Sequence, residues 1–375
     1  MGTGKIYLFH NEEISPPPKR FADYLKEPFE SVIDQTLIYK TYGNRNTGTY
    51  LMTDTLAKIV DADKFITRFY KFEEHVDTVV TNVFHRIGAN LKVDFPYWEN
   101  ILDHADRVVP LSLGFAFEGG EIAPLDESLK RLLSMISERI EVGVRTEFDA
   151  EYLNAQGFKK VCVIGCPSLF YHMDRDFKVR RKDDAIKSVN FNFTSDFRNL
   201  QISQKEAVEV HWKLLLWMKW QYERLPINVH LTMQKQPFAE ISDMHDILLS
   251  YGEIHPFYKD CGRYFYAVAD WVKELKKDDF SMGSRFHGNV AAILAGIPAL
   301  MVNVDKRMEG MNRFYGIPSI GISEFDLDKP LEYYAELADY TAFNKLYPKR
   351  FDNFTDYCKR NGIRLKTNTG GMDGQ

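Results

Sequence analysis

One stretch in the second half of the chain, DDFSMGSRFHGNVAAILAGIPALMV (278–302), brings an arginine and a histidine into one polar turn. Arg285 carries a planar, permanently charged guanidinium that suits bidentate binding of phosphate or carboxylate. His287 follows two residues later and titrates near neutrality, so it can transfer a proton. We expect Ser284 to cap a helix whose first turn holds both side chains, where free N–H groups and the helix dipole attract anions. The stretch therefore predicts an oxyanion site with a proton-transfer group beside it.

A purely structural interpretation of this motif is the alternative. Arg285 could form an ion pair with Asp278 or Asp279, and His287 could be a hydrogen-bonded histidine of the core. The motif lies between an expected strand and an expected helix, and open α/β sheets bind ligands beyond the carboxyl ends of their strands. We therefore favour the functional interpretation.

The elements that must position these residues alternate between short β-rich runs and amphipathic helical spacing. This alternation is typical of an α/β protein with mainly parallel sheets, because a parallel strand pair needs a crossover that is usually helical. Residues 1–40, with three prolines at 16–18, are expected to be irregular. The expected strands are 77–84, 106–113, 140–144, 160–165, 188–194, 227–234, 279–283 and 298–304. The expected helices are one from Thr49 and those near 126–140, 205–224, 238–250, 262–276 and 285–296.

The charge-rich segment 171–184 interrupts this alternation and is the expected domain boundary. We expect four parts: an N-terminal α/β domain, a C-terminal α/β domain, closing helices and a disordered, glycine-rich tail. Their expected ranges are 1–180, 181–330, 331–365 and 366–375.

Composition narrows the function classes. With 45% apolar and 27% charged residues among 375, the chain is globular, which excludes collagen, coiled coil and general disorder. The net charge of −5 gives no overall attraction to nucleic acid or to an anionic membrane. No apolar run reaches the roughly 20 residues that span a bilayer, and no signal peptide is recognised, so a cytoplasmic protein is expected. Four cysteines form no disulfide framework, and no His or Cys spacing suits a metal, so we expect no bound metal.

The sequence SRFHGNVAAILAGIPALMV (284–302) resembles the signature of the polysaccharide pyruvyl transferases. IEVGVRTEFDAEYLNAQGF (140–158) resembles the family's strand ending in Val-Arg and supplies Arg145 as a second arginine. VNVDKRMEGMNRFYGIP (302–318) resembles the family's Asp-Lys segment, and the polar loop 43–48 resembles its early glycine and asparagine loop.

The resemblance implies two Rossmann-like domains arranged as in GT-B glycosyltransferases, with a cleft between them. It also implies transfer of the enolpyruvyl group of phosphoenolpyruvate onto two hydroxyls of a sugar, forming a cyclic pyruvate ketal and releasing phosphate. The product would belong to bacterial surface polysaccharide, that is, capsule or exopolysaccharide. Because the donor is already activated, the chemistry requires no cofactor. A lipid-linked acceptor would place the enzyme at the inner face of the cytoplasmic membrane, in peripheral contact only.

The resemblance also assigns roles to residues. The two anionic groups of the donor would be bound by Arg285 and Arg145. Arg285 belongs to the C-terminal domain, on the donor side, and Arg145 to the N-terminal domain, on the acceptor side. His287 would transfer a proton. Ser284 and Phe286 are further donor-binding candidates from the same motif.

Other polar side chains near expected strand ends carry weaker signals. Lys306 could reach the donor phosphate together with Arg307, although the two could equally form a solvated basic pair. Asn44, Asn46 and Glu118 are the acceptor-binding candidates, although the two asparagines could equally serve only to form the turn.

Two other functions remain open. A GT-B glycosyltransferase that uses a nucleotide sugar would hold the diphosphate with Arg285. A non-catalytic member of the family would bind glycan without turnover.

Overall fold

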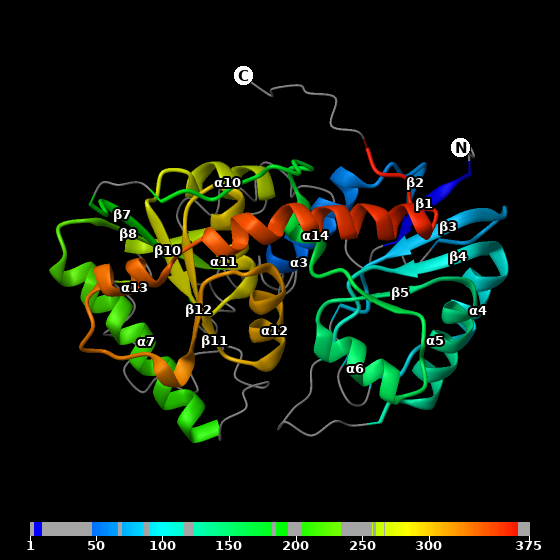
Figure 1. Ribbon diagram of the computed structural model, residues 1–375, viewed down its shortest axis with the longest axis horizontal. Coiled ribbons are helices and arrows are strands. Elements are labelled where there is room, and N and C mark those ends of the chain that lie inside the picture. The colour runs from blue at the N-terminus through cyan, green and yellow to red at the C-terminus, as the bar shows by residue number, and fades with distance from the viewer. Residues whose placement is uncertain are drawn as a thin grey trace, which may run out of the picture.

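Parallel β-sheets covered by helices form the two lobes of the molecule (Figure 1). The first lobe holds strands β1 to β6 and the second holds strands β7 to β12. The computed structural model describes residues 4–9, 47–66, 70–85, 87, 91–115, 124–181, 185–193, 204–233, 257, 260–265 and 267–366. Its α/β architecture with parallel sheets confirms the expected fold class.

The sheet of the first lobe has the strand order β2-β1-β3-β4, with every pair parallel. A parallel bridge between Leu113 and Val144 extends this sheet towards the β5-β6 pair. The strands are β1 (Ile6–Phe9), β2 (Lys64–Ile66), β3 (Val76–Thr81), β4 (Ala105–Pro110), β5 (Val142–Val144) and β6 (Val161–Val163). The helices are α3 (Thr47–Ile59), α4 (Phe95–His104), α5 (Glu127–Arg139), α6 (Glu147–Ala155) and the 3-10 helix η1 (Pro167–Phe170).

Strand β1 corrects the expectation that residues 1–40 are irregular. All four of its residues are buried, and it lies between β2 and β3 inside the sheet. A short strand that is buried on both faces carries no alternation of polar and apolar residues, so the periodicity argument misses it.

The sheet of the second lobe has six parallel strands in the order β12-β11-β10-β7-β8-β9. This order is that of a doubly wound dinucleotide-binding fold, whose ligands bind beyond the carboxyl ends of the strands where the order reverses. In this lobe that switch point lies between β7 and β10. The strands are β7 (Ser188–Asn192), β8 (Asn228–Met233), β9 (Gly262–Tyr264), β10 (Phe280–Gly283), β11 (Ala299–Asn303) and β12 (Ser319–Gly321).

The helices of the second lobe are α7 (Gln204–Arg224), α10 (Val268–Leu275), α11 (Phe286–Leu294), α12 (Lys306–Tyr315), the 3-10 helix η2 (Ile322–Glu324), α13 (Leu331–Leu337) and α14 (Thr341–Arg360). The helix expected near 262–276 is instead strand β9 followed by α10. The helix expected near 238–250 and the tail beyond 366 lie outside the described residues. Within the described ranges, no helix is long and apolar enough to cross a membrane.

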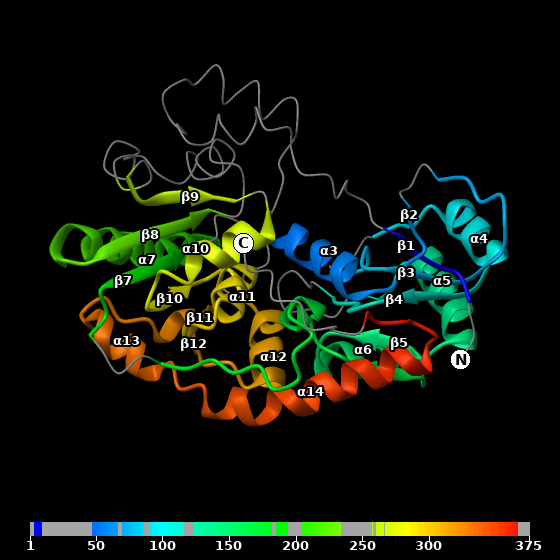
Figure 2. The ribbon, with the colours of Figure 1, turned by 90° about the horizontal axis from the view of Figure 1, so that it is seen from above.

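Two helices connect the lobes. Helix α14 runs along both of them (Figure 1), and its Tyr357 hydroxyl donates to the Glu141 carbonyl of the first lobe at 2.9 Å. Helix α3 of the first lobe contacts both α10 and α11 of the second and lies between the two sheets (Figure 2). Residues at the start of α11 therefore face the first lobe.

Candidate functional site

The polar turn after β10 leads directly into α11. The strand ends at Gly283, and α11 begins at Phe286 with Arg285 as its N-cap residue. The expectation that Ser284 caps the helix is therefore wrong: Ser284 lies one residue before the cap. The N-cap side chain makes no capping hydrogen bond, so it does not compete with an anion for the N–H groups of the first turn.

Arg285 is buried against the carboxyl end of β7. Its backbone N–H donates to Asn192 Oδ1 at 3.0 Å, and its Nε donates to the Phe193 carbonyl. A Cβ on Gly283 would lie 1.8 Å from the Asn192 carbonyl oxygen, so only glycine lets the two strand ends approach this closely. Asn192 and Gly283 are also paired in the sheet, which places Arg285 at the switch point between β7 and β10.

The two aspartates weighed as ion-pair partners of Arg285 lie at the opposite end of β10. The carboxylate of Asp279 accepts from the Lys187 and Ser188 backbone, and that of Asp278 contacts His230 Nδ1 at 2.6 Å. Four strand residues separate these aspartates from the turn, roughly 13 Å of extended chain.

Arg145 follows β5 and is almost fully buried, with 1% of its surface exposed. Its Nε donates to Ser112 Oγ at 2.9 Å, and its Nη2 lies 2.8 Å from the Met52 sulfur on α3. The nearby carboxylate of Asp149 accepts instead from the Phe115 backbone and from Thr146. Arg145 thus makes no ion pair with any described carboxylate, and burial lowers the pKa of its guanidinium.

His287 faces the first lobe from the start of α11. Its Nε2 lies 3.6 Å from the Sγ of Cys166, which follows β6. Its side chain keeps some solvent exposure, yet the desolvation by surrounding protein lowers its pKa well below the usual range. The charges of Arg145 and Arg307, and that of His85 when it is protonated, lower the pKa further, so the neutral imidazole is favoured in the free protein.

Arg307 lies close enough to this cluster to act on its charges. Lys306 is exposed at the start of α12, whose N-cap is Asp305. The Nη2 of Arg307 lies 3.6 Å from Asp305 Oδ2, and its buried Nε has no hydrogen-bond partner among the described residues. Its charge lowers the pKa values of both Arg145 and His287, which places the guanidinium near both.

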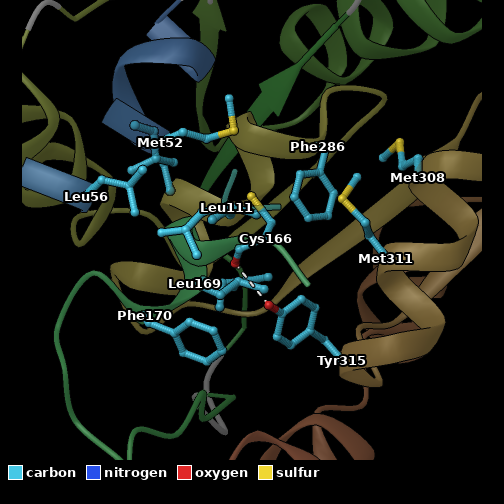
Figure 3. Packing of buried hydrophobic residues seen from close by; sticks show 14 of the residues in the cluster. Met52, Leu56, Leu111, Cys166, Leu169, Phe170, Phe286, Met308, Met311 and Tyr315 are labelled. Carbon is cyan, nitrogen blue, oxygen red and sulfur yellow. Dashed lines mark hydrogen bonds between the residues drawn. The ribbon is translucent and has the colours of Figure 1, made fainter. Parts of the chain in front are cut away.

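The remaining candidates separate into two groups. Phe286 is buried with Cys166 in the apolar cluster around the site (Figure 3), and its ring meets that of His287 edge to face at 5.3 Å. Asn44, Asn46 and Glu118 lie outside the described residues.

Sequence analysis missed the convergence of the other three side chains on His287. Arg307 was considered only as the neighbour of Lys306, and neither His85 nor Cys166 was predicted to belong to the site. Each lies within a few residues of the end of a strand, β11, β3 or β6, and that position is the one signal that could have found them. No group of three His, Cys, Asp or Glu side chains in the described part of the chain is placed to hold a metal ion.

Comparison with known proteins was made on sequence and on structure. The family model described as polysaccharide pyruvyl transferase matches residues 89–306. No curated protein sequence matches significantly.

Several solved structures share the α/β architecture at low sequence identity. S. aureus MnaA, solved with UDP, is 12% identical over 95% of this chain and 96% of its own, with a TM-score of 0.45. UDP-GlcNAc 2-epimerase from Neisseria meningitidis is 12% identical over 95% and 99% of the two chains, with a TM-score of 0.43. The enzyme of the same description from Methanocaldococcus jannaschii is 10% identical over 94% and 99%, with a TM-score of 0.41.

The family match spans more than half of the chain and covers part of each lobe. It covers the turn that carries Arg285 and His287 as well as the end of β5 that carries Arg145. On this match, the protein belongs to the polysaccharide pyruvyl transferase family.

Proposed function

We propose that this protein transfers the enolpyruvyl group of phosphoenolpyruvate onto two hydroxyls of a sugar and forms a cyclic pyruvate ketal. The observation that carries the proposal is the burial of Arg145 without a described carboxylate partner, next to His287 and Arg307. Taking an unpaired cation out of water is costly, and an anionic ligand bound beside it offsets that cost. The acceptor is a sugar, free or lipid-linked, of a bacterial surface polysaccharide, and in the lipid-linked case the enzyme works at the inner face of the cytoplasmic membrane.

The charge of the donor matches the cations that converge here. Phosphoenolpyruvate carries a carboxylate and a phosphate on a three-carbon frame, so it needs two separate anion sites close together. Arg145 and Arg307 come from different lobes and are both close enough to His287 to depress its pKa. The uncapped start of α11 adds backbone N–H donors. Arg285, bound to the end of β7 through its backbone N–H and its Nε, holds this turn in place beside the proposed donor site.

The lowered pKa of His287 supports a role as an acid that becomes protonated only when the donor binds. In the free protein the neutral imidazole is favoured, because burial and the neighbouring Arg145 and Arg307 disfavour its charged form. The negative charge of a bound donor reverses part of this effect and raises the pKa, so that His287 is protonated in the complex. His287 then gives its proton to C3 of the donor and takes one back from the sugar hydroxyl that attacks C2. The second hydroxyl closes the ketal as phosphate leaves with that hydroxyl's proton.

Ligand-dependent stability distinguishes this donor from a nucleotide sugar. A donor that binds the folded state stabilises it by RT ln(1 + [L]/Kd), so phosphoenolpyruvate is expected to raise the melting temperature while UDP and GDP sugars leave it unchanged. Stabilisation by a nucleotide sugar alone would favour a glycosyltransferase instead. Release of inorganic phosphate with a panel of free and lipid-linked sugars tests turnover, and donor binding without release on any of them would indicate a binding protein.

A further inference from the structure

The contact between Cys166 and His287 joins the two lobes at the site. Cys166 follows β6 in the first lobe, and His287 lies in the first turn of α11 in the second. Their Sγ and Nε2 atoms are 3.6 Å apart, within the range of a hydrogen bond to sulfur. The side chain of Cys166 is fully buried, so water does not compete for this contact.

The backbone around Cys166 holds the thiol in one place. Gly165 adopts a left-handed conformation with φ of 74°, and the N–H groups of Ile164 and Gly165 both donate to the Val144 carbonyl. From the second lobe, the Tyr315 hydroxyl donates to the Cys166 carbonyl at 3.0 Å (Figure 3). Atoms of both lobes therefore fix the position of the sulfur.

The other hydrogen-bond partner of the sulfur bears on whether Cys166 acts as a donor or an acceptor towards the imidazole of His287. Ser168 Oγ lies 3.0 Å from Sγ on the side of η1, and its hydroxyl can donate to the sulfur. The S–H of Cys166 is then available for Nε2 of the neutral imidazole, which has one donor and one acceptor nitrogen. A histidine that accepts at Nε2 carries its proton on Nδ1.

We propose that Cys166 is a positioning residue for His287: its sulfur holds the imidazole through Nε2 and leaves Nδ1 as the nitrogen that exchanges protons with substrate. In the neutral imidazole the S–H donates to Nε2, and in the imidazolium of the donor complex the Nε2–H donates to the sulfur, so Nδ1 stays free in both states. The proton-transfer group of the second lobe is thereby oriented by the first lobe. This inference rests on the proposed role of His287 in pyruvyl transfer, although the orientation itself does not depend on any substrate.

Selective ¹⁵N-histidine labelling measures the tautomer and the pKa of His287 directly, with a His287→Gln variant to assign its signals. In the wild-type protein we expect Nδ1 to carry the proton. Cys166→Ala removes the donor, so we expect a mixture of both tautomers and a changed pKa. Cys166→Ser keeps a donor and is expected to restore the Nδ1 form, at least in part. Arg145, His85 and Arg307, which also face His287, are unchanged in both variants.

Cys162→Ser is the matched control. This half-buried cysteine is four residues away on β6, with its Sγ near Asn353 rather than near His287. It is expected to behave as wild type in every measurement. If Cys166→Ala shows the same tautomer and pKa of His287 as this control, the proposal is wrong.

Turnover gives a second readout that separates the two proposals. In Cys166→Ala we expect kcat to fall about 10-fold with donor affinity unchanged, because a small misplacement of a reacting group costs rate rather than binding. We also expect its kcat–pH profile to shift, and Cys166→Ser to recover most of the rate. A changed tautomer in a protein that does not bind phosphoenolpyruvate would support the positioning role and contradict the proposed function. An unchanged tautomer in Cys166→Ala, in a protein that transfers pyruvate, would support the proposed function and contradict the positioning role.

Discussion

At the scale of single residues, the site is defined by buried cations that are not fully neutralised: Arg145 has no described carboxylate partner, and Arg307 has only a 3.6 Å contact with Asp305. Among the described residues, the Arg145 side chain makes hydrogen bonds only to a hydroxyl and a thioether, and the buried Nε of Arg307 has no partner. These two guanidinium groups also repel a proton on His287. Such an arrangement is unfavourable without a ligand and becomes favourable with an anion, which is the property that a donor site needs.

The pKa of His287 provides the first prediction. It is expected to titrate well below pH 6.5 in the free protein and at a higher pH once phosphoenolpyruvate is bound, because the donor's negative charge favours the imidazolium. Histidine NMR signals followed from about pH 4 to 9, with and without the donor, measure both values. A pKa that falls or stays constant on donor binding would contradict the acid role of His287.

Removing the imidazole tests the same residue by kinetics. His287→Gln is expected to keep donor binding and to lower kcat by about 10² to 10⁴, the usual contribution of a general acid–base group. Donor-induced stabilisation and phosphate release, measured on the same preparation, separate the two effects. A wild-type rate in this variant would exclude the role.

Two neighbouring residues of α12 provide a matched pair. Arg307→Ala is expected to weaken donor affinity by about 10- to 100-fold, because a hydrogen bond to a charged group contributes about 1.5 to 3 kcal/mol. Lys306→Ala removes an equal charge one residue away, at an exposed position, and is expected to have little effect. Calorimetric titration with phosphoenolpyruvate measures both. Equal losses in the two variants would mean that only the overall charge matters.

At the scale of elements, turns after strands position the reactive groups. Each of Arg145, Cys166 and Arg285 follows the carboxyl end of a parallel strand, where backbone geometry rather than side-chain packing sets the direction of the chain. The turn after β6 combines close packing with a positive φ: a Cβ on Gly165 would lie 2.1 Å from the Tyr315 hydroxyl oxygen.

Alanine substitutions at two glycines with positive φ separate the cost of backbone strain from the cost of the clash with Tyr315. Gly157 has φ of 101°, and no described atom lies within 4 Å of the place that a Cβ would take, so Gly157→Ala is expected to cost about 1 to 2 kcal/mol of unfolding free energy from strain alone. Gly165→Ala adds a clash with Tyr315, and we expect a further loss of about 1 to 3 kcal/mol together with reduced turnover. Urea unfolding measures both variants. Equal losses of unfolding free energy in the two variants would show that the Tyr315 side chain moves away without destabilising the protein.

At the scale of the whole molecule, the site exists only where the lobes meet, and the interface carries its own titratable group. Asp54 on α3 of the first lobe accepts a hydrogen bond from the backbone N–H of Val268, the first residue of α10 in the second lobe. Burial raises the pKa of this carboxyl to about 6, and the hydrogen bond from Val268 offsets only part of the shift. The interface is therefore expected to respond to pH.

The sign of this response follows from the raised pKa. Between about pH 4 and pH 6 the folded protein holds the Asp54 proton more tightly than the unfolded chain, so the contribution of this group to stability is largest below that range and is lost as pH rises through it. Asp54→Asn keeps an oxygen for the Val268 N–H and removes the buried charge. Its melting temperature is expected to exceed that of the wild type at about pH 7 to 8, and the difference should shrink towards pH 4. A difference that grows on acidification would contradict this assignment.

Local pattern was enough to predict the α/β class, most of the strands, and the strand, turn and helix that carry Arg285 and His287, because these depend on residues close together in the chain. Strand β1 escaped prediction because its burial on both faces is a property of the sheet around it. The choice of Arg307 over Lys306 depends on how α12 is rotated against the first lobe, which spacing along the sequence does not determine.

The meeting of Arg145, Cys166 and His287 was decided only by tertiary structure. Parallel sheets bring the carboxyl ends of distant strands to one edge, and the packing of α3 and α14 then sets the two edges against each other. The sequence by itself determined which side chains could bind an anion or move a proton. The packing of one lobe on the other decided which of these side chains share a site. At this contact between the lobes, burial and the charges of Arg145 and Arg307 act together on the imidazole of His287.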